Sequence, residues 1–176
     1  MKENIVLKIW LPFLLLMTAL LDGQISNMLR KAFDNQYVIL SHFMLLGLIL
    51  ASLFFSRKYL TTLSIILGLL VDNYYYGILG IVTVSLPITV SLAYWIFKYI
   101  KPSLASLFLS LVIFISLMDV SAYLIQVIFG LIKGDFINFI AQELGPTLIM
   151  NILFFIVLGY PIYKLLNKKK ASEIFL

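Results

Sequence analysis

Blocks of apolar residues, most of them close to 20 residues long, alternate along this chain with short polar or basic segments. A helix needs about 20 apolar residues to cross the hydrocarbon core of a bilayer. The pattern therefore predicts an all-α fold, a polytopic membrane bundle of about six transmembrane helices in a single domain, residues 1–176. The predicted spans cover residues 5–21, 37–55, 60–76, 78–97, 103–125 and 144–166.

Three places along the chain depart from a simple alternation of spans and short loops. Residues 22–36 are predicted as a polar loop, in which 28–33 can lie flat on the membrane. Residues 60–71 are too short an apolar run to cross alone, so helix is expected to continue through Asp72. The fifth block stays apolar to about Ile132, which is long for one crossing, so a tilted or emerging end is expected there.

Composition strengthens the membrane interpretation. Hydrophobic residues make up 62% of the chain and charged residues 12%, whereas a soluble domain carries about 25% charged residues. The net charge of +5 does not indicate nucleic-acid binding, because the basic residues stand in short clusters between apolar blocks, where they contact lipid headgroups. No small-residue cleavage site follows the first block, so it is expected to be a retained helix and not a signal peptide.

The basic residues also predict the orientation. With the N-terminus in the cytoplasm and six alternating spans, ten basic residues fall inside and three outside, which agrees with the positive-inside rule. Both termini are then cytoplasmic. The inside set is Lys2, Lys8, Arg57, Lys58, Lys98, Lys101, Lys164 and Lys168 to Lys170, and the outside set is Arg30, Lys31 and Lys133.

The sequence offers no recognisable catalytic centre. It contains one histidine and no cysteine, which leaves no thiol nucleophile and nearly excludes a metal site built from His and Cys. No G-x-S-x-G, H-E-x-x-H or phosphate-cradling glycine loop is present. We therefore expect a protein that is not an enzyme and needs no cofactor.

Four polar residues inside the predicted spans are better candidates for a functional site, because polar groups are costly in lipid. A rise of about 1.5 Å per residue places His42, Asp72, Asp119 and Asn151 roughly 18 to 24 Å from the cytoplasmic boundary, in one outer-middle layer. We expect a buried polar cluster, with Asp72 or Asp119 accepting hydrogen bonds from Asn151 or His42. It either fixes helix register or lines a groove for a partner helix or a solute. Asp72 alone is equally compatible with a carboxylate in the outer headgroup layer.

Small residues recur at a spacing of four, which lets helix backbones approach closely. These pairs predict a compact bundle without identifying a partner. They are Gly47 with Ala51, Ser64 with Gly68, and Ser106 with Ser110.

Residues 66–80 carry the pattern G-L-L-x-D-x4-G-x2-G, formed by Gly68, Asp72, Gly77 and Gly80. This segment resembles the MreD family, in which the pattern joins the third and fourth spans. The length, the number of spans, Asn151 in the last span and the basic C-terminus are also similar to that family. Asn35 and Gln36 depart from it, because many members have a Pro-Asp pair at that place.

The resemblance implies a non-catalytic scaffold in the bacterial cytoplasmic membrane that helps set cell shape. Its implied partners are MreC, a bitopic protein, and, in the larger complex that synthesises lateral peptidoglycan, a RodA-type glycosyltransferase and a class B penicillin-binding protein. It also implies a bundle similar to the substrate-binding subunits of energy-coupling-factor transporters. The alternative is therefore a vitamin-binding subunit of such a transporter, although the A-x-x-x-A pattern often used to dock its transport subunit is absent from the sequence.

Overall fold

A computed structural model describes the backbone of residues 5–174 and, within that range, all side chains except those of Ile5, Tyr76, Tyr160 and residues 165–174. All regular secondary structure in the described range is helical, which confirms the predicted all-α class. The helices are α1 (Ile5–Ala32), α2 (Phe43–Ala51), α3 (Arg57–Val71), α4 (Ile81–Tyr99), α5 (Leu104–Ile128), α6 (Phe136–Phe139) and α7 (Gly145–Ile174). Two π-helical turns, η1 (Asp72–Tyr76) and η2 (Ile140–Leu144), continue α3 and precede α7.

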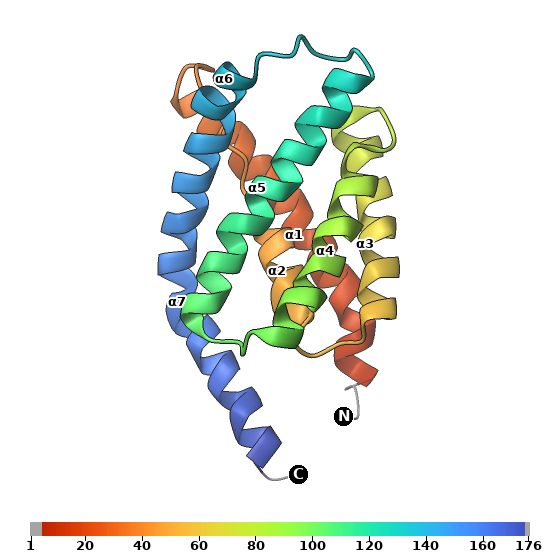
Figure 1. Cartoon of the computed structure of the whole chain (residues 1–176), viewed down its shortest axis with the longest axis vertical. Coiled ribbons are helices and arrows are strands. Elements are labelled where there is room, and N and C mark those ends of the chain that lie inside the picture. The colour runs from red at the N-terminus through yellow and green to blue at the C-terminus, as the bar shows by residue number, and fades with distance from the viewer. Residues whose placement is uncertain (1–4, 175–176) are drawn as a thin grey trace.

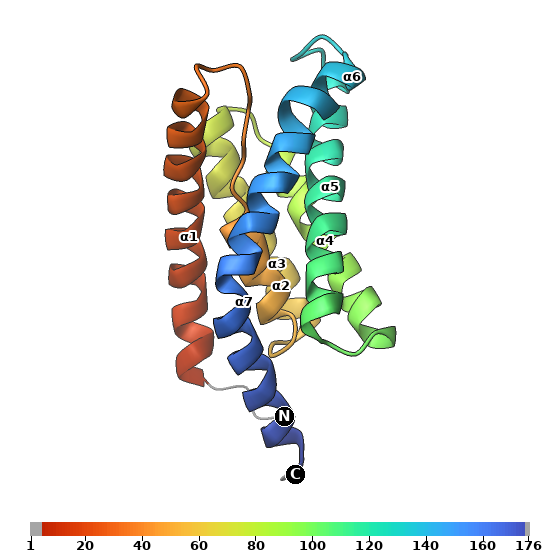
Figure 2. The same cartoon turned by 90° about the vertical axis from the view of Figure 1, so that its left-hand side faces the viewer.

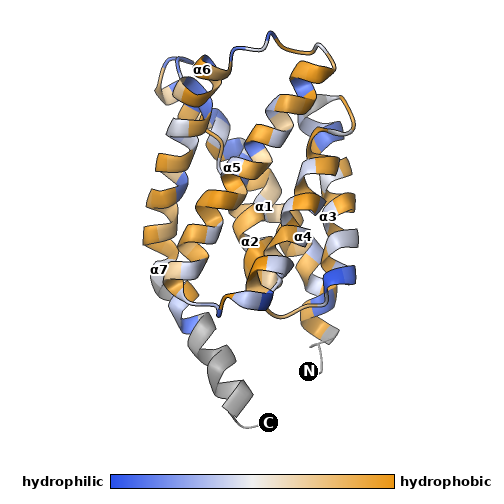
Figure 3. Cartoon of the chain, in the orientation of Figure 1, coloured by the Kyte–Doolittle hydropathy of each residue, from blue (hydrophilic) through white to orange (hydrophobic). Residues whose placement is uncertain are grey.

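The long helices lie side by side in one elongated bundle (Figure 1). Successive segments run up and down the long axis, so that α1 begins and α7 ends at the same end of the bundle. Apolar residues cover the middle of the helices, and hydrophilic residues gather toward the two ends and between the helices in the upper half (Figure 3). This distribution is the one expected of a protein whose sides face lipid.

Four helical segments of the described chain are long and apolar enough to cross a membrane: Val6–Ala32, Ile81–Tyr99, Leu104–Ile128 and Phe136–Gly159. The predicted count of six is therefore not confirmed. In place of the predicted second span, residues 37–55, the chain forms a helix of only nine residues, α2. The predicted third span is a 15-residue helix, α3, followed directly by the five-residue turn η1.

The prediction of a polar loop at residues 22–36 is wrong for most of its length, because α1 continues to Ala32. Its 28 residues correspond to about 42 Å of helix, longer than a hydrocarbon core of about 30 Å. The chain then turns at Asp34 and Asn35, both with positive φ. Asp22, the first residue of the predicted loop, lies on the helix and accepts hydrogen bonds from Phe43 and Met44.

Leucines dominate the interior of the bundle, with Leu15, Leu48, Leu60, Leu86 and Leu107 each 0% exposed. In lipid these side chains gain little from leaving water, so close packing between helices must hold them together. The closest packing lies between α3 and α4, where the helix backbones meet at Gly68. The two helices and η1 form a hairpin that fixes one wall of the polar region described next.

Candidate functional site

Residues 38–42 descend into the bundle as an extended segment before α2 begins (Figure 2). Such a segment cannot satisfy its own backbone groups, and α7 supplies partners for them. The Leu40 N–H donates to Thr147 Oγ1 at 3.0 Å, and the His42 N–H donates to Asn151 Oδ1 at 2.9 Å. The Asn151 amide in turn donates to the Leu40 carbonyl at 2.7 Å. Two polar residues one turn apart on α7 therefore replace the hydrogen bonds that a helix would have made.

The first turn of α2 is satisfied from α1. The side chain of His42, the residue before α2, makes no capping bond. Instead Asp22 accepts hydrogen bonds from the backbone N–H groups of Phe43 and Met44, each at 2.8 Å, and from the Ser41 hydroxyl. A carboxylate at a helix N-terminus is favourable, because the helix dipole and the free N–H groups both attract negative charge. Asp22 thus caps a helix that is remote from it in sequence.

The His42 ring pairs with Asp119 of α5. Its Nε2 lies 3.2 Å from Oδ1 and 3.3 Å from Oδ2 of the carboxylate. Both residues are buried, at 6% and 4% exposure. Because Asn151 binds the His42 backbone, the structure brings together three of the four polar residues that the depth argument grouped.

Asp72 stands apart from that cluster, and in this respect the prediction is wrong. Its carboxylate is fully buried and accepts hydrogen bonds at the start of α4: from the N–H groups of Gly80 (2.8 Å), Val82 (2.7 Å) and Thr83 (3.0 Å), and from the Thr83 hydroxyl (2.7 Å). The alternative of a carboxylate among the outer headgroups is wrong as well, because Asp72 is 0% exposed. Asp72 is the cap of α4.

The glycines of the motif complete the same hairpin. A Cβ on Gly68 would lie 2.6 Å from the Thr83 Cα, so the close approach of α3 and α4 requires glycine there. Gly77 ends η1 with φ +64°, and its N–H donates to the Asp72 carbonyl at 2.8 Å. Gly80 precedes α4 with φ +116°. Both values lie where side chains are strained. The motif therefore builds a tight, capped turn between two helices.

Among the other small residues singled out in the sequence, Gly47 lies at a helix contact, Ala51, Ser64 and Ser110 are buried, and Ser106 belongs to the cap of α5. A Cβ on Gly47 would lie 2.9 Å from a methyl group of Leu15 on α1. Ala51 is 6% exposed and Ser64 is 0% exposed. These positions serve packing within the chain, and a role in binding a partner remains a prediction for them.

A cavity of about 290 Å³ adjoins the cluster. It lies between α1, the segment before α2, η1, α5 and η2, and its polar lining includes Asp22, His42, Asp119 and Glu143. Sequence reasoning missed Asp22, Thr147 and Glu143. A signal for two of them exists: Asp22 with Ser26, and Thr147 with Asn151, are polar pairs at a spacing of four, which places each pair on one helix face.

No group of three or more His, Cys, Asp or Glu residues in the described part of the chain has a geometry that could hold a metal ion. The arrangement around His42 can fix an irregular backbone segment and can offer carboxylates to the cavity.

Comparison with known proteins gives two matches. The family described as rod shape-determining protein MreD matches residues 2–169. The Cell shape-determining protein MreD of Streptococcus pneumoniae (strain ATCC BAA-255 / R6) is 26% identical over 150 residues, which cover 85% of this chain and 88% of that protein. No solved structure matches the chain.

Proposed function

The chain belongs to the MreD family of rod shape-determining proteins, and on that premise we propose that it is a non-catalytic membrane scaffold of the cell-elongation complex. The observation that carries this proposal is the family match, which extends over residues 2–169 and so covers every long helix except the last residues of α7. A role in cell shape follows from the family itself. The finer steps are that the chain binds an MreC-like bitopic protein and joins a RodA-type glycosyltransferase and a class B penicillin-binding protein in lateral peptidoglycan synthesis.

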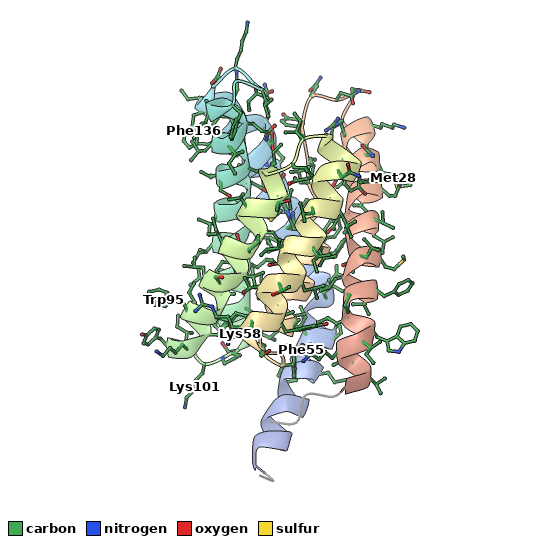
Figure 4. The ribbon with its side chains drawn as sticks, turned by 90° about the vertical axis from the view of Figure 1, so that its right-hand side faces the viewer. Met28, Phe55, Lys58, Trp95, Lys101 and Phe136 are labelled. Atoms are coloured by element: carbon green, nitrogen blue, oxygen red, sulfur yellow. The ribbon has the colours of Figure 1, made fainter. Side chains whose placement is uncertain are left out.

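We propose a multi-pass topology with both termini in the cytoplasm. The start of α1 and the end of α7 lie at one end of the bundle, which is expected for an even number of crossings. Lys58 and Lys101 lie toward that end, together with Trp95 and Phe55, whereas Met28 and Phe136 lie toward the other (Figure 4). Basic residues at one end support this orientation. Lys2 lies outside the described residues, and the side chains of Lys168 to Lys170 are not described.

In this topology the segment 38–51 is a fifth crossing and α3 with η1 a sixth. Extended backbone is tolerated at membrane depth only where protein or a water-filled cavity surrounds it. Asp22, Thr147 and Asn151 meet that requirement, because their side-chain oxygens accept hydrogen bonds from the backbone N–H groups of this segment. A crossing that is half extended and half helical has too short a helix to be recognised by its length.

The bitopic partner is expected to bind through helix packing within the bilayer. Since lipid provides no hydrophobic drive between helices, affinity must come from close contact and a few hydrogen bonds. The outer side of α1 is well suited to contact lipid or another helix. Only 11% of the most apolar stretch of this helix is buried within the chain. Trp10 and Phe13 are exposed on it, at 62% and 55%.

The alternative function, a substrate-binding subunit of an energy-coupling-factor-type vitamin transporter, is favoured by one observation, the cavity beside His42 and Asp119. A ligand pocket is expected to combine an apolar wall with a few converging polar groups. The family match and the absence of A-x-x-x-A from the sequence favour the scaffold.

Two measurements test the scaffold. Solubilisation of host membranes in mild detergent, followed by affinity purification of the intact chain, should recover a single-span protein and elongation enzymes. Depletion of the chain should turn elongated cells into rounder ones, measured as the ratio of cell length to width. Unchanged cell shape together with recovery of an ATP-driven transport subunit would favour the transporter instead.

A further inference from the structure

The cavity beside the extended segment holds two acidic groups, Asp119 and Glu143, whose hydrogen-bonding capacity is not fully used by the described residues. Asp22 uses most of its capacity, because it accepts from Ser41, Phe43 and Met44. Asp119 differs from it. The carboxylate is 4% exposed and lines the cavity, and its partner among the described residues is the ring of His42. A carboxylate has about four acceptor sites, so Asp119 retains capacity on the side of the cavity.

Glu143 faces the same space from η2. It is half-buried and lines the cavity, and within the described residues its carboxylate makes no hydrogen bond and no ion pair. It lies within electrostatic range of Asp119, which repels it, and of Arg30 and His42, which attract it. Within the described residues one imidazole pairs with Asp119, and Glu143 adds a second carboxylate to the same cavity. Negative charge that is not matched in a partly desolvated site favours a cation.

The basic group nearest this space is Arg30, near the end of α1. Its side chain is exposed, so water and salt screen its charge. The buried Asp119 is screened much less. The interior of the cavity is therefore electronegative and its mouth mixed in charge, which favours a cationic occupant over an anionic one.

The remaining lining suits a small organic molecule better than a bare ion. Apolar side chains of Met44, Val71, Val82, Met118 and Ala122 form much of the wall. The volume, about 290 Å³, lies just below the range for ligand pockets, about 300–1,000 Å³, which suits a small ligand. An aliphatic chain can contact these residues while an ammonium group reaches Asp119 and Glu143.

We propose that this cavity binds a small organic cation, an aliphatic amine whose ammonium group is held by Asp119 and Glu143. The His42 ring, held by the Asn151 bond to its backbone N–H, orients the Asp119 carboxylate. Occupancy places the ligand against the extended segment, so binding should stabilise the helices that pin that segment. The proposal is independent of the scaffold role, which is tested by co-purification and cell shape.

The test uses the purified full-length chain in nanodiscs of phosphatidylcholine, a lipid without net charge, with empty nanodiscs as the blank. Isothermal titration calorimetry compares putrescine with 1,4-butanediol, which has the same chain length and hydroxyl groups in place of the amines. Putrescine is expected to bind saturably and butanediol not to bind. Absence of saturable binding for putrescine, ethanolamine and methylammonium alike would overturn the proposal.

Two variants, each with a matched control, test whether the ligand binds in this cavity. Glu143→Gln removes one charge and should weaken putrescine binding about tenfold or more, because one charge-assisted contact is lost. Its matched control, Asp34→Asn, removes a charge from an exposed turn and should leave affinity unchanged. Ala122→Leu should fill the cavity and abolish binding, whereas Ala105→Leu on the exposed side of the same helix should not. Equal affinities for Glu143→Gln and Asp34→Asn would sink the proposal even if Ala122→Leu failed to fold.

Discussion

Replacing Asp72 should loosen the hairpin between α3 and α4. The native carboxylate accepts four hydrogen bonds from the first turn of α4, one through Oδ1 from Val82 and three through Oδ2 from Gly80 and from the backbone and hydroxyl of Thr83. Asp72→Ala removes all four acceptor contacts. Asp72→Asn can place its single carbonyl oxygen at the Oδ2 position and keep three of them.

The magnitudes follow from this count. A buried donor left without an acceptor costs about 1–3 kcal/mol. Asp72→Asn leaves the Val82 N–H facing an amide NH2 group and loses the attraction of a charge for the helix N-terminus, so it should cost about 2–3 kcal/mol. Asp72→Ala leaves all four donors without this acceptor and should cost about 4 kcal/mol or more. This value is the lower end of the sum over the four donors, because the losses of neighbouring hydrogen bonds are not additive.

Unfolding by SDS in mixed micelles, followed by circular dichroism, measures these differences in the free energy of unfolding. Asp34→Asn is the matched control, because Asp34 is exposed and has a positive φ that asparagine tolerates. The expected order of stability is wild type and Asp34→Asn, then Asp72→Asn, then Asp72→Ala. If Asp72→Ala were as stable as the control, the carboxylate would not hold α4. Equal losses in the two Asp72 variants would show that charge matters and that the number of acceptors does not.

Three further predictions concern the packing, the extended segment and the orientation. Gly68→Ala should destabilise the chain by about 1–3 kcal/mol, since the added Cβ meets the α4 backbone at 2.6 Å, whereas Gly159→Ala, with open space around it, should be neutral or stabilising in the same assay. Asn151→Ala leaves a backbone N–H and a carbonyl of the extended segment without their partners and should cost about 2–4 kcal/mol; a loss below about 1 kcal/mol would mean that water replaces the amide. Reporter fusions after Lys101 should report the cytoplasm and fusions after Lys31 the outside, and the reverse result would contradict the topology.

Hydropathy was a good guide wherever one helix crosses the bundle without interruption. Residues 78–97 and 103–125 were predicted, and the helices run over Ile81–Tyr99 and Leu104–Ile128. It is a poor guide at residues 22–36, where polar and charged side chains predict a loop but the helix α1 continues to Ala32. The charge of Asp22 is satisfied by N–H groups about 20 residues further along the chain. The spacing of Asp22 and Ser26 indicates a shared helix face, but it does not identify these distant partners.

The depth argument for His42 used the rise of a helix, about 1.5 Å per residue, for a segment that is extended. An extended chain advances about 3.3 Å per residue, so His42 lies deeper below the end of its span than was expected. The grouping with Asp119 and Asn151 survived, because all three lie on segments that enclose the same space. What could not be predicted was the break itself, since Val38 to Leu46 reads as continuous apolar sequence apart from Ser41 and His42.

Depth alone could not place Asp72, because equal depth says nothing about which way a side chain points around its helix. The motif did contain that direction. Gly68 and Asp72 are four residues apart, so they lie on one face of a helix. A glycine in such a motif indicates a close helix neighbour, and the helix that follows a short turn is the nearest candidate. The structure has Gly68 against the backbone of α4 and Asp72 on its first turn. The spacing G-x-x-x-D therefore predicts a carboxylate aimed at the following helix. A carboxylate in that position can cap the start of that helix.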